Sequence, residues 1–174
     1  MGEVIEIGIV SQTKNTYSNM LNFLESYLNM KNTVQIINIM DNWLYDNTIE
    51  INSIKEAENY MESKIVTIEK RSPYNQVGVS VEKSKNGYII ECWINPYNEM
   101  PEKEYRNLID EIINYLKDKN MVDVCGIGKE VSVDYSKNIY TLINDSHNID
   151  LWLISQQCYI INKINNLNIK MTII

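Results

Sequence analysis

The stretch from Val77 to Lys119 carries the strongest structural signals in the chain. Residues 77–81 alternate valine with small or polar residues, which predicts a strand with one apolar face. The Asn-Gly pair at 86–87 separates this run from a second one, 88–94, so a β-hairpin with a positive-φ turn is expected. The second run is largely apolar on both faces, which predicts an interior strand covered on both sides. Pro96 predicts the end of that strand, because proline cannot donate to a ladder.

A long amphipathic helix is predicted directly after the hairpin. Pro101 suits the first helical turn, where its missing N–H costs nothing. Glu102 and Glu104 add negative charge near the helix N-terminus, where the helix dipole favours it. An apolar stripe at helical spacing follows, formed by Tyr105, Leu108, Ile109, Ile112, Ile113 and Leu116. A hairpin followed by such a helix predicts a sheet with a helix packed on it.

The rest of the chain carries weaker signals for strands and for helices. A capping box, Ser53 with Glu56, predicts the start of one helix, because each side chain satisfies a free N–H group of the other residue. Residues 136–144 fit either a short helix or a strand. Strands are expected at 3–10, 34–40, 64–70, 122–127, 130–135, 149–154 and 167–173, and helices at 16–30, 53–62 and 156–165.

These elements predict an α+β fold: one central, mainly antiparallel sheet with two or three helices packed on it. A mixed α/β arrangement stays open, because residues 3–40 have a β-α-β pattern. No Gly/Ser/Pro-rich linker interrupts the chain, so residues 1–174 are expected to form a single globular domain.

The charge of the chain restricts its partners. With 23 acidic and 16 basic residues, the formal net charge is -7. Phosphates need Lys and Arg, so broad nucleic-acid or anionic-membrane binding is not expected, whereas a basic protein partner is permitted. No apolar run is long enough to span a bilayer and no signal peptide is apparent, so a cytoplasmic location is expected.

Histidine and cysteine chemistry is poorly supported. His147 is the one histidine, so a Ser-His-acid triad would have to use it, yet it lies in a polar, turn-forming cluster. Cys92, Cys125 and Cys158 stand far apart, which predicts buried free thiols and neither a disulfide framework nor a zinc site. No metal, cofactor or catalytic residue is therefore predicted.

The glycine-rich segment Gly126-Ile-Gly128-Lys129 does not match a phosphate-binding loop. That loop needs an earlier glycine and a Ser or Thr after the lysine. Positions 123 and 130 are Asp and Glu, so both requirements fail. The segment instead predicts a glycine turn between two strands.

Paired carboxylates are candidates for acid–base or magnesium chemistry. They include Asp41 with Asp46, and Glu102 with Asp110 and Glu111. None has a diagnostic spacing, and helix charges of this kind are typical of a solvated face.

The aperiodic stretch 41–50 is the most suggestive for function. It places aromatic residues among acids just after a predicted strand. Aromatic side chains dominate protein interface hot spots, and nearby acids can steer a basic partner. The predicted partner-binding residues are Asp41, Trp43, Tyr45, Asp46 and Glu50. In the alternative interpretation, Trp43 and Leu44 cover an edge of the core.

Three classes of function therefore stay open. The first is a small acidic binding protein that occupies a protein partner, for example an immunity protein that neutralises a basic toxin domain. The second is an enzyme that uses carboxylates without histidine or zinc, and the third is a structural or assembly subunit. A flat acidic and aromatic patch favours the first, a deep pocket with converging acids the second, and a large exposed apolar face the third.

Overall fold

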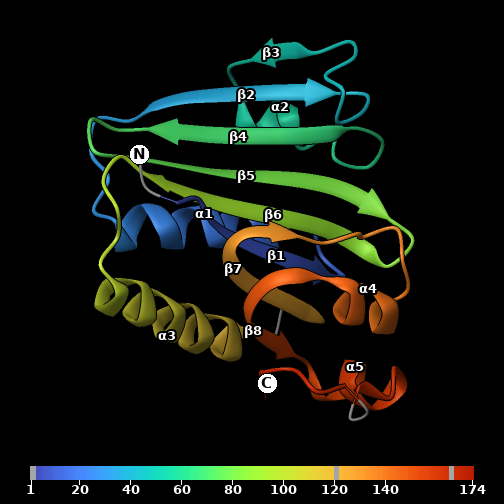
Figure 1. Ribbon diagram of the computed structural model, residues 1–174. Coiled ribbons are helices and arrows are strands. Elements are labelled where there is room, and N and C mark those ends of the chain that lie inside the picture. Colours follow the sequence, from blue (N-terminus) through green and yellow to red (C-terminus); the bar gives the residue numbers. More distant parts are fainter. Residues whose placement is uncertain (1–2, 120–121, 165–166) are drawn as a thin grey trace.

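The computed structural model describes residues 3–119, 122–164 and 167–174. Within these residues the chain forms one nine-stranded sheet and five helices (Figure 1). The strands are β1 (Ile5–Ser11), β2 (Val34–Met40), β3 (Ile49–Ile51), β4 (Ile65–Arg71), β5 (Asn75–Ser84), β6 (Gly87–Pro96), β7 (Val124–Ser132), β8 (His147–Ile154) and β9 (Met171–Ile173). The helices are α1 (Thr16–Tyr27), α2 (Ile54–Ala57), α3 (Glu102–Lys119), α4 (Ile139–Asp145) and α5 (Gln156–Ile161). The predicted α+β class is confirmed.

The sheet has the strand order β3-β2-β4-β5-β6-β1-β7-β8-β9. Every neighbouring pair is antiparallel except β8 and β9, which are parallel. β1 lies in the middle of the sheet between β6 and β7, far from β2. The opening β-α-β pattern therefore makes no parallel pair, and α1 instead connects two separated strands across the sheet.

Two hydrophobic cores lie on opposite faces of the sheet. The larger one packs α1, α2 and α3 on one face, against alternate residues of the central strands. Four of the six residues in the predicted α3 stripe are buried, namely Tyr105, Leu108, Ile112 and Leu116, and the other two, Ile109 and Ile113, are partly buried against the same core. The smaller core packs α4 and α5 on the other face, at the β7–β8 end. On that second face the smaller core covers β1 only at Val10, and the rest of the face over β1, β6, β5 and β4 carries the candidate site.

The hairpin of β5 and β6 is present, but its turn differs from the expectation. Ser84 pairs with Gly87, so Lys85 and Asn86 are the two turn residues. Among the hairpin residues only Gly87 has a positive φ, of 120°. The prediction that Asn86 and Gly87 form the centre of the turn is therefore wrong by one residue.

The glycines at 126 and 128 lie inside β7 and do not form a turn. A Cβ on Gly126 would meet the Trp152 ring at 2.9 Å, and one on Gly128 would meet the Asn148 carbonyl oxygen at 1.9 Å. The predicted turn is wrong because these glycines leave room for β8 to approach β7, where the register between the two strands shifts.

Two boundary predictions also have clear outcomes. The Ser53 hydroxyl caps α2 by accepting a bond from the Glu56 N–H at 3.3 Å, which is one of the two bonds of the predicted capping box. The helix ends at Ala57, short of the predicted residue 62. Residues 136–144, which fitted either a helix or a strand, form most of the short helix α4, whose N-cap is Asn138 and which ends at Asp145. The predicted end of the last helix, Asn165, lies outside the described residues. Among the described helices, none combines the length and the apolar character needed to cross a membrane.

Candidate binding cavity

The open face of the sheet presents polar residues in one cross-strand row. Along each central strand, residues facing α1 and α3 alternate with residues facing the other way. The strand register aligns the outward residues directly opposite one another. From the β3 edge inward, the row is Glu50, Asn38, Thr67, Ser80, Glu91 and Gly8.

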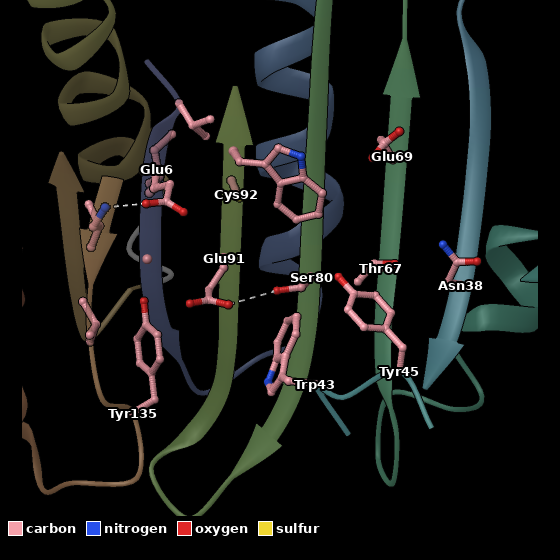
Figure 2. Close-up of a pocket in the computed structure, with 16 residues that line it drawn as sticks. Glu6, Asn38, Trp43, Tyr45, Thr67, Glu69, Ser80, Glu91, Cys92 and Tyr135 are labelled. Atoms are coloured by element: carbon pink, nitrogen blue, oxygen red, sulfur yellow. Dashed lines mark hydrogen bonds between the residues drawn. The ribbon is translucent and has the colours of Figure 1, made fainter. Parts of the chain in front are cut away.

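A cavity of about 500 Å³ lies on this face. Its lining includes three glutamates, Glu6, Glu69 and Glu91. It also includes four aromatic side chains, Trp43, Tyr45, Trp93 and Tyr135. No described residue that lines it is a lysine, arginine or histidine. Figure 2 shows Glu91 near the centre of the cavity, with Tyr135 on one side and Trp43 on the other.

Glu91 is the most perturbed carboxylate of the cavity. Burial, reinforced by the negative charge of Glu6, raises its pKa from the ordinary 4.5 to about 7. The hydroxyl of Ser80 donates a weak hydrogen bond to it at 3.4 Å, which opposes the rise only in part. Glu6 is a diagonal neighbour on β1, because Glu91 pairs with Gly8 in the sheet register. Two carboxylates therefore converge, and no described cation pairs with either.

The third glutamate is less available. Glu69 forms an ion pair with Arg71, two residues along the same strand. Its charge is therefore balanced at the rim, and the uncompensated negative charge of the cavity lies at Glu6 and Glu91.

Tyr135 closes one side of the cavity above Gly8. A Cβ on Gly8 would lie 1.8 Å from the Tyr135 hydroxyl oxygen, so the glycine makes room for the phenol ring. The Tyr135 side chain is partly buried, and its hydroxyl makes no hydrogen bond to another described residue. Burial and the negative charge of Glu91 raise its pKa well above the ordinary value, so it stays protonated.

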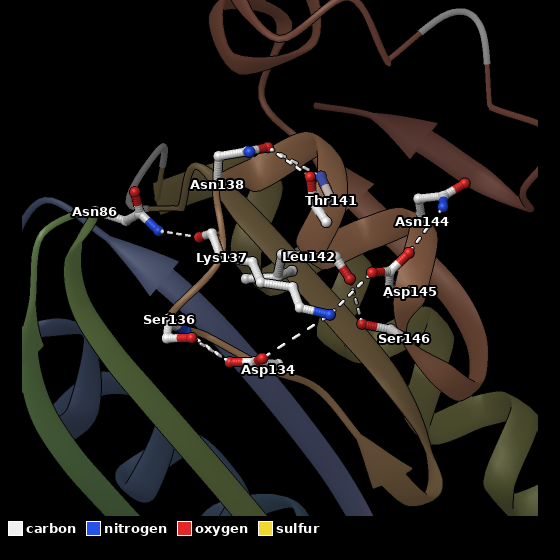
Figure 3. Close-up of polar contacts among 10 residues, drawn as sticks. All are labelled: Asn86, Asp134, Ser136, Lys137, Asn138, Thr141, Leu142, Asn144, Asp145 and Ser146. Carbon is white, nitrogen blue, oxygen red and sulfur yellow. Dashed lines mark hydrogen bonds and ion pairs between the residues drawn. The ribbon is translucent and has the colours of Figure 1, made fainter.

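The segment that carries Tyr135 is fixed by a local polar network (Figure 3). The Lys137 ammonium lies 2.9 Å from the Asp145 carboxylate and 3.9 Å from that of Asp134. The backbone carbonyl of Lys137 accepts a bond from the Asn86 side-chain amide at 2.9 Å, which connects this segment to the hairpin turn. Tyr135 is therefore held between two anchors, one on α4 and one on the β5–β6 turn.

Trp93 is accommodated in the same way on the neighbouring strand pair. A Cβ on Gly78, its partner across the sheet, would lie 2.1 Å from the indole ring. The ring therefore lies flat across β5 and forms part of the cavity floor. The two glycines at positions 8 and 78 give the open face both its depth and its aromatic walls.

The loop between β2 and β3 forms the opposite rim of the cavity. Trp43 is 44% exposed and Tyr45 67% exposed, so both rings are accessible to a partner. The Trp43 indole N–H donates to the Glu82 carboxylate on β5 at 2.9 Å, which fixes the loop above the sheet. Leu44, between them, is 82% exposed. The interpretation that Trp43 and Leu44 cover a core edge is therefore wrong for Leu44.

The predicted acids of this stretch have different roles. Asp41 forms an ion pair with Lys64 and accepts a bond from the Asn47 amide at 2.6 Å, so it shapes the loop. Asp46 likewise accepts a bond from the Asn42 side chain at 2.9 Å. Glu50 lies on the edge strand β3, exposed, in the same row as Glu91. The structure thus brings Trp43, Tyr45 and Glu50 to the open face, while Asp41 and Asp46 bond within the loop region.

Of the residues with other candidate chemistry, only Cys92 lines the cavity, among the described residues. His147 is exposed at the start of β8. The three cysteines are buried and unpaired, as predicted, and burial raises the pKa of each thiol, to about 11 for Cys158. Within the described ranges no group of three or more His, Cys, Asp or Glu side chains is arranged to hold a metal ion.

The central residues of the cavity were not predicted from the sequence. Glu6 and Glu91 each occupy an outward position in a strand whose inward positions are apolar. Tyr135 is the last residue of the strand predicted at 130–135, whereas β7 ends at Ser132. Alternation alone places each residue on a face, but it does not pair β6 with β1. A signal was present in the glutamates and glycines that interrupt otherwise apolar strands, since a carboxylate in such a strand has a high desolvation cost.

Comparison of the chain with protein-family models, with curated proteins and with solved structures finds no significant match. Functional conclusions therefore rest on the chemistry of its own residues.

Proposed function

We propose that the protein acts by binding a basic protein partner through the open face of the sheet. The observation that carries this proposal is the rim of the cavity, where exposed Trp43 and Tyr45 stand over uncompensated glutamates. Exposed neighbouring aromatics are typical of interface anchors, and a negative face favours a positive partner. An immunity protein that neutralises a basic toxin domain is the form of this role that suits a small acidic chain. The expected cytoplasmic location belongs to the same proposal.

An enzyme that uses carboxylates is the second candidate, and one observation favours it. Glu91 has a pKa of about 7 in a cavity that also contains Glu6, and perturbed carboxyl pairs of this kind serve as proton donors and acceptors. Binding is preferred because the rim of the cavity is formed by an exposed aromatic loop suited to contact a macromolecule. Turnover of a small molecule with no protein partner present would favour the enzyme.

The test first captures a partner protein from the native cell with the parent protein as bait. It then compares the binding kinetics of the parent protein and its variants with that partner. Trp43→Ala should weaken binding of the captured basic protein by about 2 kcal/mol or more, roughly thirtyfold, because the indole is an anchor. Glu50→Gln should mainly slow association and reduce its salt dependence, because this exposed carboxylate steers and does not anchor. Association and dissociation rates at two salt concentrations separate the two effects.

Tyr74→Ala is the matched control, because Tyr74 is 78% exposed and lies in the β4–β5 turn, at the other end of β4. It should bind like the parent protein. Normal binding by a folded Trp43→Ala variant, or equal losses in Trp43→Ala and Tyr74→Ala, would refute the proposed interface.

A further inference from the structure

Building on the proposed function, we propose that the cavity receives one arginine side chain of the partner. Its guanidinium group lies between the carboxylates of Glu91 and Glu6, and its flat faces lie against the aromatic walls. This assigns a ligand class to the cavity and a recognition residue to the partner.

The polar groups of the cavity are suited to a donor-rich cation. Glu91 and Glu6 lie on adjacent strands, β6 and β1, and converge on the same space. Glu6 accepts one bond, from the Val131 N–H, and Glu91 accepts one weak bond from Ser80. Each carboxylate therefore keeps acceptor capacity directed into the cavity. A guanidinium has five N–H donors and no acceptor, so it complements this set.

A separate observation points to the same ligand. Tyr135 is partly buried and lines the cavity, and its hydroxyl makes no hydrogen bond to another described residue. A phenol oxygen that faces a cavity in this way can accept a hydrogen bond from a ligand donor. Lys137, two residues along the chain, is bonded to Asn86 and Asp145. These contacts keep the Tyr135 hydroxyl in place.

The walls and the size of the cavity favour arginine over lysine. The indoles of Trp43 and Trp93 and the phenols of Tyr45 and Tyr135 line it. A guanidinium stacks on aromatic faces while it bonds to carboxylates in its plane, whereas an ammonium is a strongly hydrated point charge. The volume of about 500 Å³ exceeds that of a guanidinium alone, so the methylene stem and part of the neighbouring backbone also fit.

The experiment titrates the full chain with acetyl-Gly-Arg-Gly-amide and follows the indole N–H signals of Trp43 and Trp93 by NMR. Saturable shifts of both signals are expected. The peptide with citrulline, a neutral shape mimic of arginine, should bind at least about tenfold more weakly, because it loses the charge-assisted hydrogen bonds. The lysine peptide should also bind more weakly. Free arginine should not bind more tightly than the peptide, because its own carboxylate is repelled by the cavity.

Glu91→Gln should weaken binding of the arginine peptide at least about tenfold at pH 8, where Glu91 is ionised. Glu111→Gln is the matched control, because it removes the same charge from exposed α3 on the opposite face. Equal binding of arginine and citrulline peptides, equal losses in the two variants, or no shift at millimolar peptide would overturn the assignment. Tighter binding of free arginine than of the peptide would also overturn it, by making a small molecule the ligand.

The outcomes separate this inference from the proposed function. A captured basic protein that needs Trp43 but binds Glu91→Gln normally would refute the arginine site and leave the binding role intact. Peptide binding with the expected selectivity, but without any protein retained through Trp43, would support the site and refute the binding role.

Discussion

Ile112→Ala is expected to lower the free energy of unfolding by about 2–5 kcal/mol, the usual cost of truncating a buried isoleucine. Ile112 lies at the middle of α3 and has no exposed surface, packed in the larger core between this helix and the sheet. Removal of its outer carbons leaves a cavity that the sheet, fixed by its ladder, cannot easily close. Chemical denaturation of both proteins measures the difference in the free energy of unfolding, with the same denaturant dependence used for the variant and the parent protein.

Ile160→Ala is the control for this truncation. Ile160 is 66% exposed on α5, so the same change of side chain should alter stability by less than about 0.5 kcal/mol. A loss of that small size at Ile112 would contradict the packing of α3 on the sheet.

Glu91→Gln is expected to stabilise the protein at pH 8 by about 2–3 kcal/mol, after allowance for its partial exposure. The folded protein raises the pKa of this carboxyl from 4.5 to about 7, so folding favours its protonated form. The stability contributed by the neutral carboxyl is fully present below pH 4.5 and is lost as the pH rises through 7. Glutamine keeps the shape without the charge, so the variant escapes this loss.

Urea denaturation at several pH values from 4 to 8 tests the prediction. The stability difference between Glu91→Gln and the parent protein should be small at the acid end, grow between about pH 4.5 and 7, and then level off. Glu111→Gln should show no such growth. A difference that stays constant with pH would mean that Glu91 ionises normally. Glu91→Gln is thus expected to raise stability while it weakens ligand binding. This combination is typical of residues that are retained for function.

Much of the fold could be predicted from local patterns. The alternation in 77–94 gave the hairpin, and the helical stripe behind Pro101 gave α3 with its buried face. These signals are local, because side-chain period and turn residues follow from a few neighbouring positions. The glycines of β7 were misread as a turn, because their role is to admit Trp152 and the backbone at Asn148, which belong to a strand about 20 residues later.

The site could be predicted only in part, for a related reason. Trp43 and Tyr45, which line the cavity, were noticed in the sequence because they stand together in one aperiodic segment. Glu6, Glu91 and Tyr135 come from three distant parts of the chain, and the strand order β6-β1-β7 brings them together. That order depends on long-range pairing, which alternation does not encode. The cavity therefore emerges only when the register of the sheet is known.

The most direct test of the central claim is an NMR titration of the Glu91 carboxyl, without and with acetyl-Gly-Arg-Gly-amide. The free protein should show a pKa of about 7, because the carboxyl is buried beside Glu6 and no cation among the described residues pairs with it. Saturating peptide should lower that pKa, because a bound guanidinium favours the ionised form. A pKa that is already ordinary in the free protein, or one that the arginine peptide leaves unchanged, would contradict the assignment of this cavity as a site for a basic partner.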